Sequence, residues 1–302
     1  ILSPDGELNR LSFSALPAPE NPTIPLGEAV HLRQLTTGRD LIRLHESIPT
    51  GEIPLVMANP SFGNIARSYK VLRESSNATT AVAIAKQRFL SYGSSAWPAL
   101  PSADLEGHRI STLLSGQLLS GPEASTVQLK RHQGPRILHI ASHAFSLPDS
   151  ANKQESTLLR SIGLVLAGGN NPGSNSDDDG YLTAAEASFL NLRGTELVTL
   201  SACETGQGYI SSGEGVYGLQ RALTLAGARS TLLSLWKVDD AATLEFMVRF
   251  YTRLKAGEGR ADALSAVQKE FRDGIPGHPD WKEPYYWAAW QLVGDWRPIK
   301  GL

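Results

Sequence analysis

The sequence predicts an α/β fold in which a mostly parallel sheet is covered by helices on both faces. The first observation is a series of short apolar runs rich in Val, Ile and Leu, at residues 137–141, 162–167, 197–201 and 231–235. The second is that stretches with helical patterns lie between or after these runs. Strands that alternate with helices are usually parallel neighbours, so this order favours a parallel sheet.

The first hundred residues carry weaker patterns. The elements expected there are a tight turn at 5–8, a short strand at 11–13, a strand at 55–58 that ends at Asn59-Pro60, and a helix at 81–90. Residues 98–101 begin and end with proline, which is typical of a linker or subdomain edge. We therefore divide the chain into an N-terminal subdomain, residues 1–100, and a larger subdomain, residues 101–302.

The larger subdomain holds the stronger helical signals. The expected helices cover residues 104–114, 183–190, 215–226 and 240–256. The residues on or near one side of the first helix, which we expect to be its buried side, are Leu105, His108, Ile110, Leu113 and Leu114. Thr183 is followed three residues later by Glu186, which is the signature of a capping box at a helix N-terminus.

Cys203 is the only cysteine of the chain, and it follows the apolar run 197–201. His143 follows the run 137–141 in the same way. In parallel sheets, functional residues gather beyond the carboxyl ends of the strands, and both residues lie at such predicted ends. A thiol and an imidazole placed there are the parts of a cysteine nucleophile and its base.

The alternative is that both residues are structural. A lone cysteine at the end of a core strand is most often a small buried hydrophobic residue, and a lone histidine is most often hydrogen-bonded in the core. The remaining histidines stay in this structural class; they include His31, His45, His108, His132 and His278. His139 and His143 are four residues apart, which suits a metal on a helix, but they lie in a strand-like run, so we predict no metal site.

Composition excludes several classes of function. The hydrophobic content of 41% and charged content of 19% are ordinary for a soluble globular protein. The net charge is −2 without a basic stripe or tail, which argues against direct binding to nucleic acid or to an anionic membrane. No run approaches the length of a membrane span. A single cysteine excludes an internal disulfide and fits a reducing cytoplasm.

Two features concern processing. The chain begins with Ile1, not Met, and has no signal peptide, so we expect it to be a piece of a longer protein. Residues 170–180 hold no large apolar residue and include the acidic run 177–179. This composition predicts a solvated, mobile loop, and a site of proteolytic cleavage between the two candidate residues. This loop lacks the ligand spacing of a calcium site.

Four blocks of sequence carry a family resemblance. They are Leu-His-Ile-Ala-Ser-His at 138–143, Leu-Ser-Ala-Cys-Glu-Thr-Gly at 200–206, Leu-Trp-Lys-Val-Asp-Asp at 235–240 and Tyr-Tyr-Trp-Ala-Ala-Trp at 285–290. In this order they resemble the CHAT domain, a caspase-like module usually fused to tetratricopeptide repeats in bacteria. The second and fourth blocks are specific, and weaker matches extend the resemblance over most of the chain.

This resemblance implies the caspase–separase fold, a three-layer caspase-hemoglobinase-like sandwich with the mostly parallel sheet in the middle. It also implies a His–Cys dyad, with His143 as the base and Cys203 as the nucleophile. The backbone amides of Ala144 and Cys203 would form the oxyanion hole. The family commonly has Gly where this chain has Ala144, and Ala keeps the N–H but resists positive φ.

The block at 235–240 implies a specificity pocket. Separases carry a similar Trp-x-Val-x-Asp block whose Asp binds the P1 arginine, and by this match Asp240 selects a basic P1 residue, with Asp239 as the alternative acid. Asp240 also lies where the N-cap of the following helix is expected, so a structural role competes with this one.

The function that we predict is a cysteine endopeptidase that cleaves a protein substrate after Arg or Lys and needs no cofactor. It would be the cytoplasmic effector half of a bacterial defence or cell-death protein, gated by a repeat or sensor region ahead of this chain. One alternative is an inactive caspase-like scaffold. Another is an unrelated α/β thiol enzyme such as an acyl transferase, for which the sequence holds no phosphate-binding motif.

Overall fold

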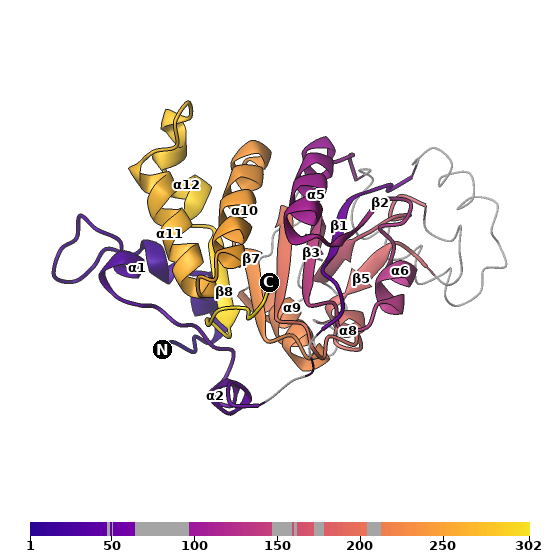
Figure 1. The fold of residues 1–302 in the computed structure, drawn as a ribbon, viewed down its shortest axis with the longest axis horizontal. Helices are drawn as coiled ribbons and strands as arrows, with labels where there is room; N and C mark the ends of the chain where they lie inside the picture. The colour runs from indigo at the N-terminus through magenta and orange to yellow at the C-terminus, as the bar shows by residue number, and fades with distance from the viewer. Residues whose placement is uncertain are drawn as a thin grey trace.

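The structure is a computed structural model that describes residues 1–46, 49, 51–63, 97–146, 159, 162–171, 178–203 and 213–302. Within these residues the strands form one eight-stranded sheet, and helices cover both of its faces (Figure 1). The predicted α/β fold with a mostly parallel central sheet is therefore confirmed. The expected helix at 81–90 lies outside the described residues.

The sheet is parallel at its centre and antiparallel at its margins. The strands are β1 (Leu55–Pro60), β2 (Gln117–Gly121), β3 (Ile137–Ser146), β4 (Ile162–Val165), β5 (Tyr181–Thr183), β6 (Leu197–Cys203), β7 (Ser230–Ser234) and β8 (Trp290–Gly294). Their order is β2-β1-β3-β6-β7-β8, and all neighbours are parallel except β7 and β8. Past the end of its pairing with β1, β3 pairs with the antiparallel strand β4, which pairs with β5.

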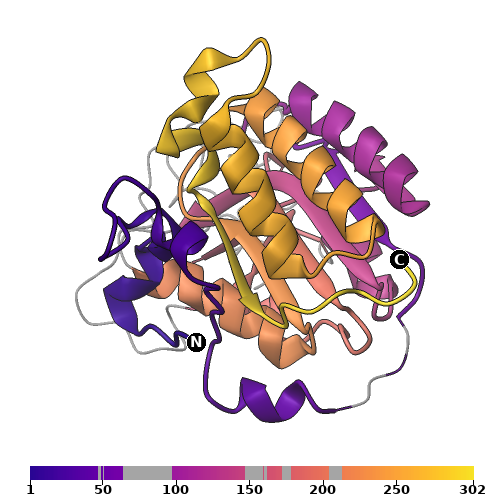
Figure 2. The ribbon, with the colours of Figure 1, turned by 60° about the vertical axis from the view of Figure 1, so that its left-hand side comes forward.

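The long helices lie in two layers. The α-helices are α1 (Leu26–Ala29), α2 (Asp40–Arg43), α5 (Pro101–Leu114), α6 (Thr126–Arg131), α8 (Ala184–Ala187), α9 (Gly213–Ala226), α10 (Asp240–Lys255), α11 (Arg260–Asp273) and α12 (Pro284–Trp287). Helices α5, α10 and α11 run side by side over one face of the sheet (Figure 2). Helices α6, α8 and α9 pack on the other face.

Two apolar cores fill the spaces between the sheet and these layers. Successive residues of a strand point to opposite faces. Val56, Ile137 and Leu197 accordingly pack with residues of α10 and α11, such as Phe246 and Phe271. The residues that follow Ile137 in β3 and Leu197 in β6 are Leu138 and Val198, and they pack with α8 and α9 on the opposite face. Because both faces are buried, each central strand appears in the sequence as a mostly apolar run, interrupted by buried polar residues such as His139 and Thr199.

Several expected elements are confirmed with small shifts. Strands occur at 55–58, 137–141, 197–201 and 231–234, and α8 begins with the expected capping box between Thr183 and Glu186. Strand β3 continues to Ser146, so His143 lies inside the strand rather than after it. The apolar run at 162–167 forms β4, which is antiparallel to β3.

Other expectations are wrong. Residues 11–13 form no strand and lead into the 3-10 helix η2 (Phe13–Ala15), because local hydrogen bonds such as that from the Phe13 N–H to the Leu11 carbonyl replace a sheet partner. The expected turn at 5–8 is present, since the Leu8 N–H donates to the Asp5 carbonyl at 3.2 Å, and it opens the 3-10 helix η1 (Gly6–Arg10). On α5 the buried positions include Glu106 and Ile110, whereas Leu105 and His108 are exposed. The expected buried face is therefore rotated.

The first hundred residues contribute directly to the sheet. Strand β1 lies between β2 and β3, and β2 and β3 belong to the larger subdomain. Isolated bridges from Leu2 to Gln34 and from Gln34 to Val293 place the first residues along the β8 edge. The division at residue 100 stays a prediction.

Candidate active site

His143 and Cys203 lie on adjacent parallel strands at the same end of the sheet. Strands β3 and β6 pair without a break from Ile137 opposite Leu197 to His143 opposite Cys203. Neighbouring strands are about 4.8 Å apart, so the two backbones are in direct contact. The structure describes the backbone of Cys203 but not its side chain. The fold thus brings together two residues that are 60 positions apart in the sequence.

The imidazole of His143 is enclosed, with a relative exposure of 0%. Its Nε2 atom lies 2.8 Å from the carbonyl oxygen of Pro98. The rings of Phe62 and Trp97 pack against it, with centroids 5.0 and 5.3 Å away and tilts of 37° and 34°. A carbonyl can only accept a hydrogen bond, so Nε2 carries the proton and the lone pair of the neutral ring is on Nδ1.

The environment of His143 favours its neutral form. Burial is the main cause and lowers the pKa of His143, and the positive charge of Lys237 lowers it further. The hydrogen bond to Pro98 and the negative charge of Asp240 act in the opposite direction. Burial prevails because the charged imidazolium loses its hydration. At neutral pH the ring can therefore accept a proton.

The loop between β7 and α10 lies at the same end of the sheet and carries both candidate acids. Asp239 is the N-cap of α10, because its Oδ1 accepts hydrogen bonds of 3.0 Å from the N–H groups of Ala241 and Ala242. Our expectation that Asp240 occupies the N-cap is thus wrong. Asp240 is the first residue of α10 and is exposed, while the buried side chain of Val238 anchors the loop.

Ala144 adopts ordinary strand geometry. It lies within β3, opposite Leu164 of β4. Among the described residues other than glycine, positive φ occurs only at Asn59 and Ser115. The backbone at Ala144 therefore does not need glycine, and its N–H is kept without the strain that positive φ would impose.

His139 belongs to a separate buried network. Its Nδ1 lies 3.1 Å from the hydroxyl of Tyr251, which donates a hydrogen bond of 2.7 Å to Thr199. Its Nε2 lies 3.1 Å from Oε1 of Glu106, within ion-pair distance but not aligned for a hydrogen bond. Burial raises the pKa of Tyr251, so its hydroxyl stays protonated. These contacts join β3 to α5 and α10, so His139 has a structural role.

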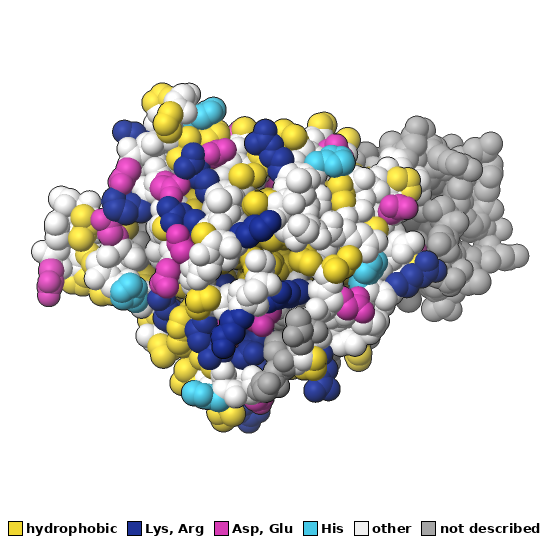
Figure 3. All heavy atoms as spheres, in the orientation of Figure 1, with side chains coloured by type: hydrophobic (Ala, Val, Ile, Leu, Met, Phe, Trp, Pro, Cys, Tyr) yellow, Lys and Arg dark blue, Asp and Glu magenta, His cyan; other side chains and the backbone are white. Residues whose placement is uncertain are grey.

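The described residues hold no group of three His, Cys, Asp or Glu side chains that could bind a metal ion. In the same part of the chain, no helix combines the length and the apolar composition that crossing a bilayer requires. Positive and negative side chains are interspersed on the face shown in Figure 3. Over α10 and α11, for example, Arg249 pairs with Glu245 and Glu270 at 2.6 and 2.8 Å.

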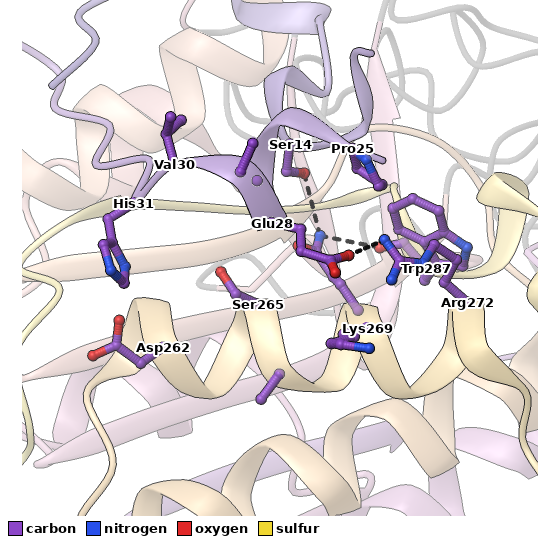
Figure 4. A pocket seen from close by; sticks show the side chains of 14 residues that line it. Ser14, Pro25, Glu28, Val30, His31, Asp262, Ser265, Lys269, Arg272 and Trp287 are labelled. Carbon is purple, nitrogen blue, oxygen red and sulfur yellow. Dashed lines mark hydrogen bonds and ion pairs between the residues drawn. The ribbon is translucent and has the colours of Figure 1, made fainter. Parts of the chain in front are cut away.

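A hollow of about 310 Å³ lies elsewhere, between α1 and α11 (Figure 4). Glu28 of α1 points toward Arg272 of α11 and forms an ion pair with it. Ser14 and Gln268 meet on the same side at 3.5 Å. None of the candidate catalytic or specificity residues lines this hollow.

Sequence reasoning missed Phe62, Trp97 and Pro98. They lie in irregular segments of the weakly patterned first hundred residues, and they reach His143 only through the tertiary fold. The signal that the sequence does hold is the pair Trp97-Pro98, in which an aromatic ring precedes a residue with fixed φ. We interpreted that stretch as a linker.

A family model described as CHAT domain matches residues 1–295. Tetratricopeptide repeat protein 28 from Homo sapiens is 28% identical over an alignment of 218 residues, which covers 66% of this chain and 8% of that protein. The protein of the same name from Mus musculus is 28% identical over an alignment of 222 residues, which covers 66% of this chain and 9% of that protein. The chain therefore spans less than a tenth of the length of these curated relatives.

Two solved structures are similar at lower identity. One is the separase–securin complex of Saccharomyces cerevisiae, with a TM-score of 0.41 and 14% identity, covering 87% of this chain and 14% of that one. The other is described as "Structure of Protease", with a TM-score of 0.43 and 12% identity, covering 95% of this chain and 58% of that one. The family assignment rests on the family model.

Proposed function

The chain belongs to the CHAT domain family, and from this membership and the geometry of the site we propose that it is a cysteine endopeptidase. The observation that carries the proposal is the placement of His143 opposite Cys203, where the parallel pairing of β3 with β6 ends. His143 is in addition neutral, buried and held through Nε2. These are the properties that a base for a thiol requires.

In the proposed reaction, Nδ1 of His143 takes the proton of the Cys203 thiol. The thiolate sulfur attacks the carbonyl carbon of the scissile peptide bond and forms a tetrahedral intermediate. The C–N bond then breaks, the leaving amine takes the proton from the imidazolium, and a thioester remains on Cys203. Water, deprotonated by His143, hydrolyses the thioester and restores the thiol. A free thiol has a pKa of about 8.5, so this proton transfer is needed at neutral pH.

The backbone amides of Ala144 and Cys203 are the proposed donors to the oxyanion. Ala144 lies within β3 and Cys203 is the last residue of β6, so the positions of both amides are set by the sheet before a substrate binds. Fixed donors stabilise a developing negative charge better than mobile ones, and removal of one typically costs about 3–4 kcal/mol of barrier stabilisation. The extended backbone at Ala144 supports an active enzyme over the inactive scaffold that we considered from the sequence.

Asp240 is the proposed acid of the specificity pocket. Asp239 uses its carboxylate to cap α10, which leaves Asp240 as the better candidate of the two. Its charge also reaches His143, since it raises the pKa of that residue. A carboxylate on the loop after β7, at the same end of the sheet as His143 and Cys203, suits a substrate with Arg or Lys at P1.

The proposed setting is a larger protein with tetratricopeptide repeats, as the names of the two mammalian relatives suggest. A repeat region would bind a partner and control access of the protein substrate. Because these relatives are mammalian, a bacterial source is not part of this proposal. The role in defence or cell death stays a prediction, as does a cytoplasmic location.

The test is cleavage of a mixed peptide library, read by mass spectrometry, with Cys203→Ala as the control. We expect cleavage after Arg or Lys that the control lacks and that Asp240→Asn redirects to other P1 residues. Cleavage by both proteins, or labelling of Cys203→Ala and the parent alike by a peptide electrophile, would contradict the proposed nucleophile. Cleavage after other residues would contradict the role of Asp240 alone.

A further inference from the structure

Residues 97 and 98 hold His143, yet they belong to no helix or strand. A histidine base needs a fixed ring, because the lone pair must point at the thiol. The contact that selects the tautomer is the carbonyl of Pro98, 2.8 Å from Nε2. Something else must therefore fix the peptide group ahead of Pro98.

Asn170, in the turn after β4, makes that contact. Its Oδ1 accepts a hydrogen bond of 2.8 Å from the Trp97 N–H, and its Nδ2 donates one of 3.0 Å to the Trp97 carbonyl. The two bonds clamp the peptide units on both sides of Trp97, the second of which is the bond to Pro98. Nδ2 also lies 3.3 Å from the carbonyl of Gly63. The residue is buried, with 2% exposure.

We propose that Asn170 is a positioning residue of this site. Its side-chain amide fixes the Trp97–Pro98 peptide, and the fixed φ of Pro98 extends this constraint to the Pro98 carbonyl that orients His143. Its effect on the reaction rests on the proposed function. Its effect on the imidazole does not, because orientation and tautomer exist without a substrate.

An amide is the group that this position requires. It must offer one acceptor to an N–H group and donors to two carbonyls, and Asn provides both. A carboxylate would keep the acceptor but would place buried negative charge beside two carbonyl oxygens. An apolar side chain would leave the Trp97 N–H and carbonyl without these partners. The expected solvated loop at 170–180 is thus wrong at its first residue.

Phe62, the second aromatic ring that packs against His143, is held independently of the Asn170 side chain. The backbone N–H groups of Gly168 and Asn170 donate to the carbonyls of Ser61 and Phe62, at 3.0 and 2.7 Å. These bonds do not need the Asn170 side chain. The Trp97 side chain is also held, because its Nε1 donates a hydrogen bond of 3.1 Å to the hydroxyl of Tyr181. Truncation of Asn170 should therefore loosen the Pro98 carbonyl and leave Phe62 in place.

The experiment is long-range ¹H–¹⁵N NMR on protein labelled with ¹⁵N-histidine, with the His143 signal assigned through His143→Gln. In the parent protein we expect the Nε2–H tautomer of the neutral ring. In Asn170→Ala we expect a mixture of tautomers and a lower pKa of His143, because the Pro98 hydrogen bond raises that pKa. Peptide cleavage should fall about 10- to 100-fold in kcat with little change in KM.

Asn9→Ala is the matched control. Asn9 is also 2% exposed, and its Nδ2 likewise lies near two backbone carbonyls, those of Pro4 and Gly6 at 3.4 and 3.2 Å. It lies outside the candidate site, so its loss should leave the tautomer and pKa of His143 unchanged. An equal change in both variants would show a general loosening and would overturn the proposal.

A folded Asn170→Ala protein that keeps the parent tautomer and pKa would also overturn it. If Asn170→Ala does not fold, the isosteric Asn170→Asp carries the same test with the same expected change. Failure of both to fold, while Asn9→Ala folds, would make Asn170 a structural residue and reject the positioning role. If the parent protein cleaves no peptide, the proposed function fails, but the NMR comparison still decides the role of Asn170.

Discussion

His139 and His143 lie four residues apart on the same face of β3 and occupy different environments. His139 is enclosed by Glu106, Tyr251 and Thr199 beneath α5 and α10. His143 lies further along the strand, where β3 leaves β6, and it is held between two aromatic rings and a backbone carbonyl. One strand thus supplies a residue that joins the layers and a residue that faces the candidate site. The two histidines should therefore respond differently to substitution.

The first prediction concerns the His139 network. Tyr251→Phe removes the hydroxyl between His139 and Thr199 in a fully buried place. Buried polar groups that lose their partner cost about 1–3 kcal/mol. We expect the free energy of unfolding in urea to fall by about that amount. Tyr286→Phe, at a residue that is only partly buried, is the control and should change it by less than about 0.5 kcal/mol.

The second prediction concerns pH. Because burial lowers the pKa of His143, the unfolded chain binds a proton near pH 6.5 that the folded protein does not yet bind. The contribution of this residue to stability is therefore complete above pH 6.5 and decreases as pH falls toward the lowered pKa. Urea unfolding at pH 7.5 and 5.5 should show this loss, and His143→Gln should reduce it. An unchanged pH dependence in that variant would contradict the assignment.

The third prediction separates the two charges near His143. Lys237 lowers the pKa of His143 and Asp240 raises it. Lys237→Met should therefore raise that pKa, and Asp240→Asn should lower it further. Both side chains are exposed, so neither change should disturb the fold. NMR titration of His143 measures both shifts, and shifts of the same sign in the two variants would refute this electrostatic account.

The parts of the structure that the sequence predicts share one physical cause. Strands that are buried on both faces are mostly apolar, so β3, β6 and β7 are visible in the sequence as short apolar runs. The residues that follow these runs can then be placed at one edge of the sheet. His143 and Cys203 could be proposed as a pair because parallel strands bring their carboxyl ends to one edge.

The parts that the sequence hides depend on contacts between distant segments. Glu106 points inward on α5 because it meets His139 of β3, which reverses what an apolar pattern predicts for a charged residue. Pro98 and Asn170 act through backbone groups and a single amide. Such contacts leave no periodic signal, since any residue type carries a carbonyl. Sequence alone therefore located the candidate base but not the residues that hold it.

The fourth prediction distinguishes Asp239 from Asp240. Asp239→Ala removes two hydrogen bonds at the N-terminus of α10, and the loss of an N-cap costs about 1 kcal/mol. Asp240→Asn should change stability by a few tenths of that, since only a charge near the helix N-terminus is lost. P1 preference should show the opposite order, with the larger change in Asp240→Asn. Equal effects of the two variants on stability and on P1 preference would contradict the assignment of the helix cap to Asp239 and of P1 recognition to Asp240.

The fifth prediction concerns Ala144, the position at which the family resemblance leads us to expect glycine. Since Ala144 is extended and shows no positive φ, glycine offers it no conformational advantage. Ala144→Gly should lower the free energy of unfolding by about 0.5–1 kcal/mol, because glycine loses more backbone entropy on folding. The kcat for a peptide substrate should stay within about twofold, as the same N–H remains. A tenfold rise in kcat would instead mean that the methyl group of Ala144 holds the oxyanion donor away from the substrate.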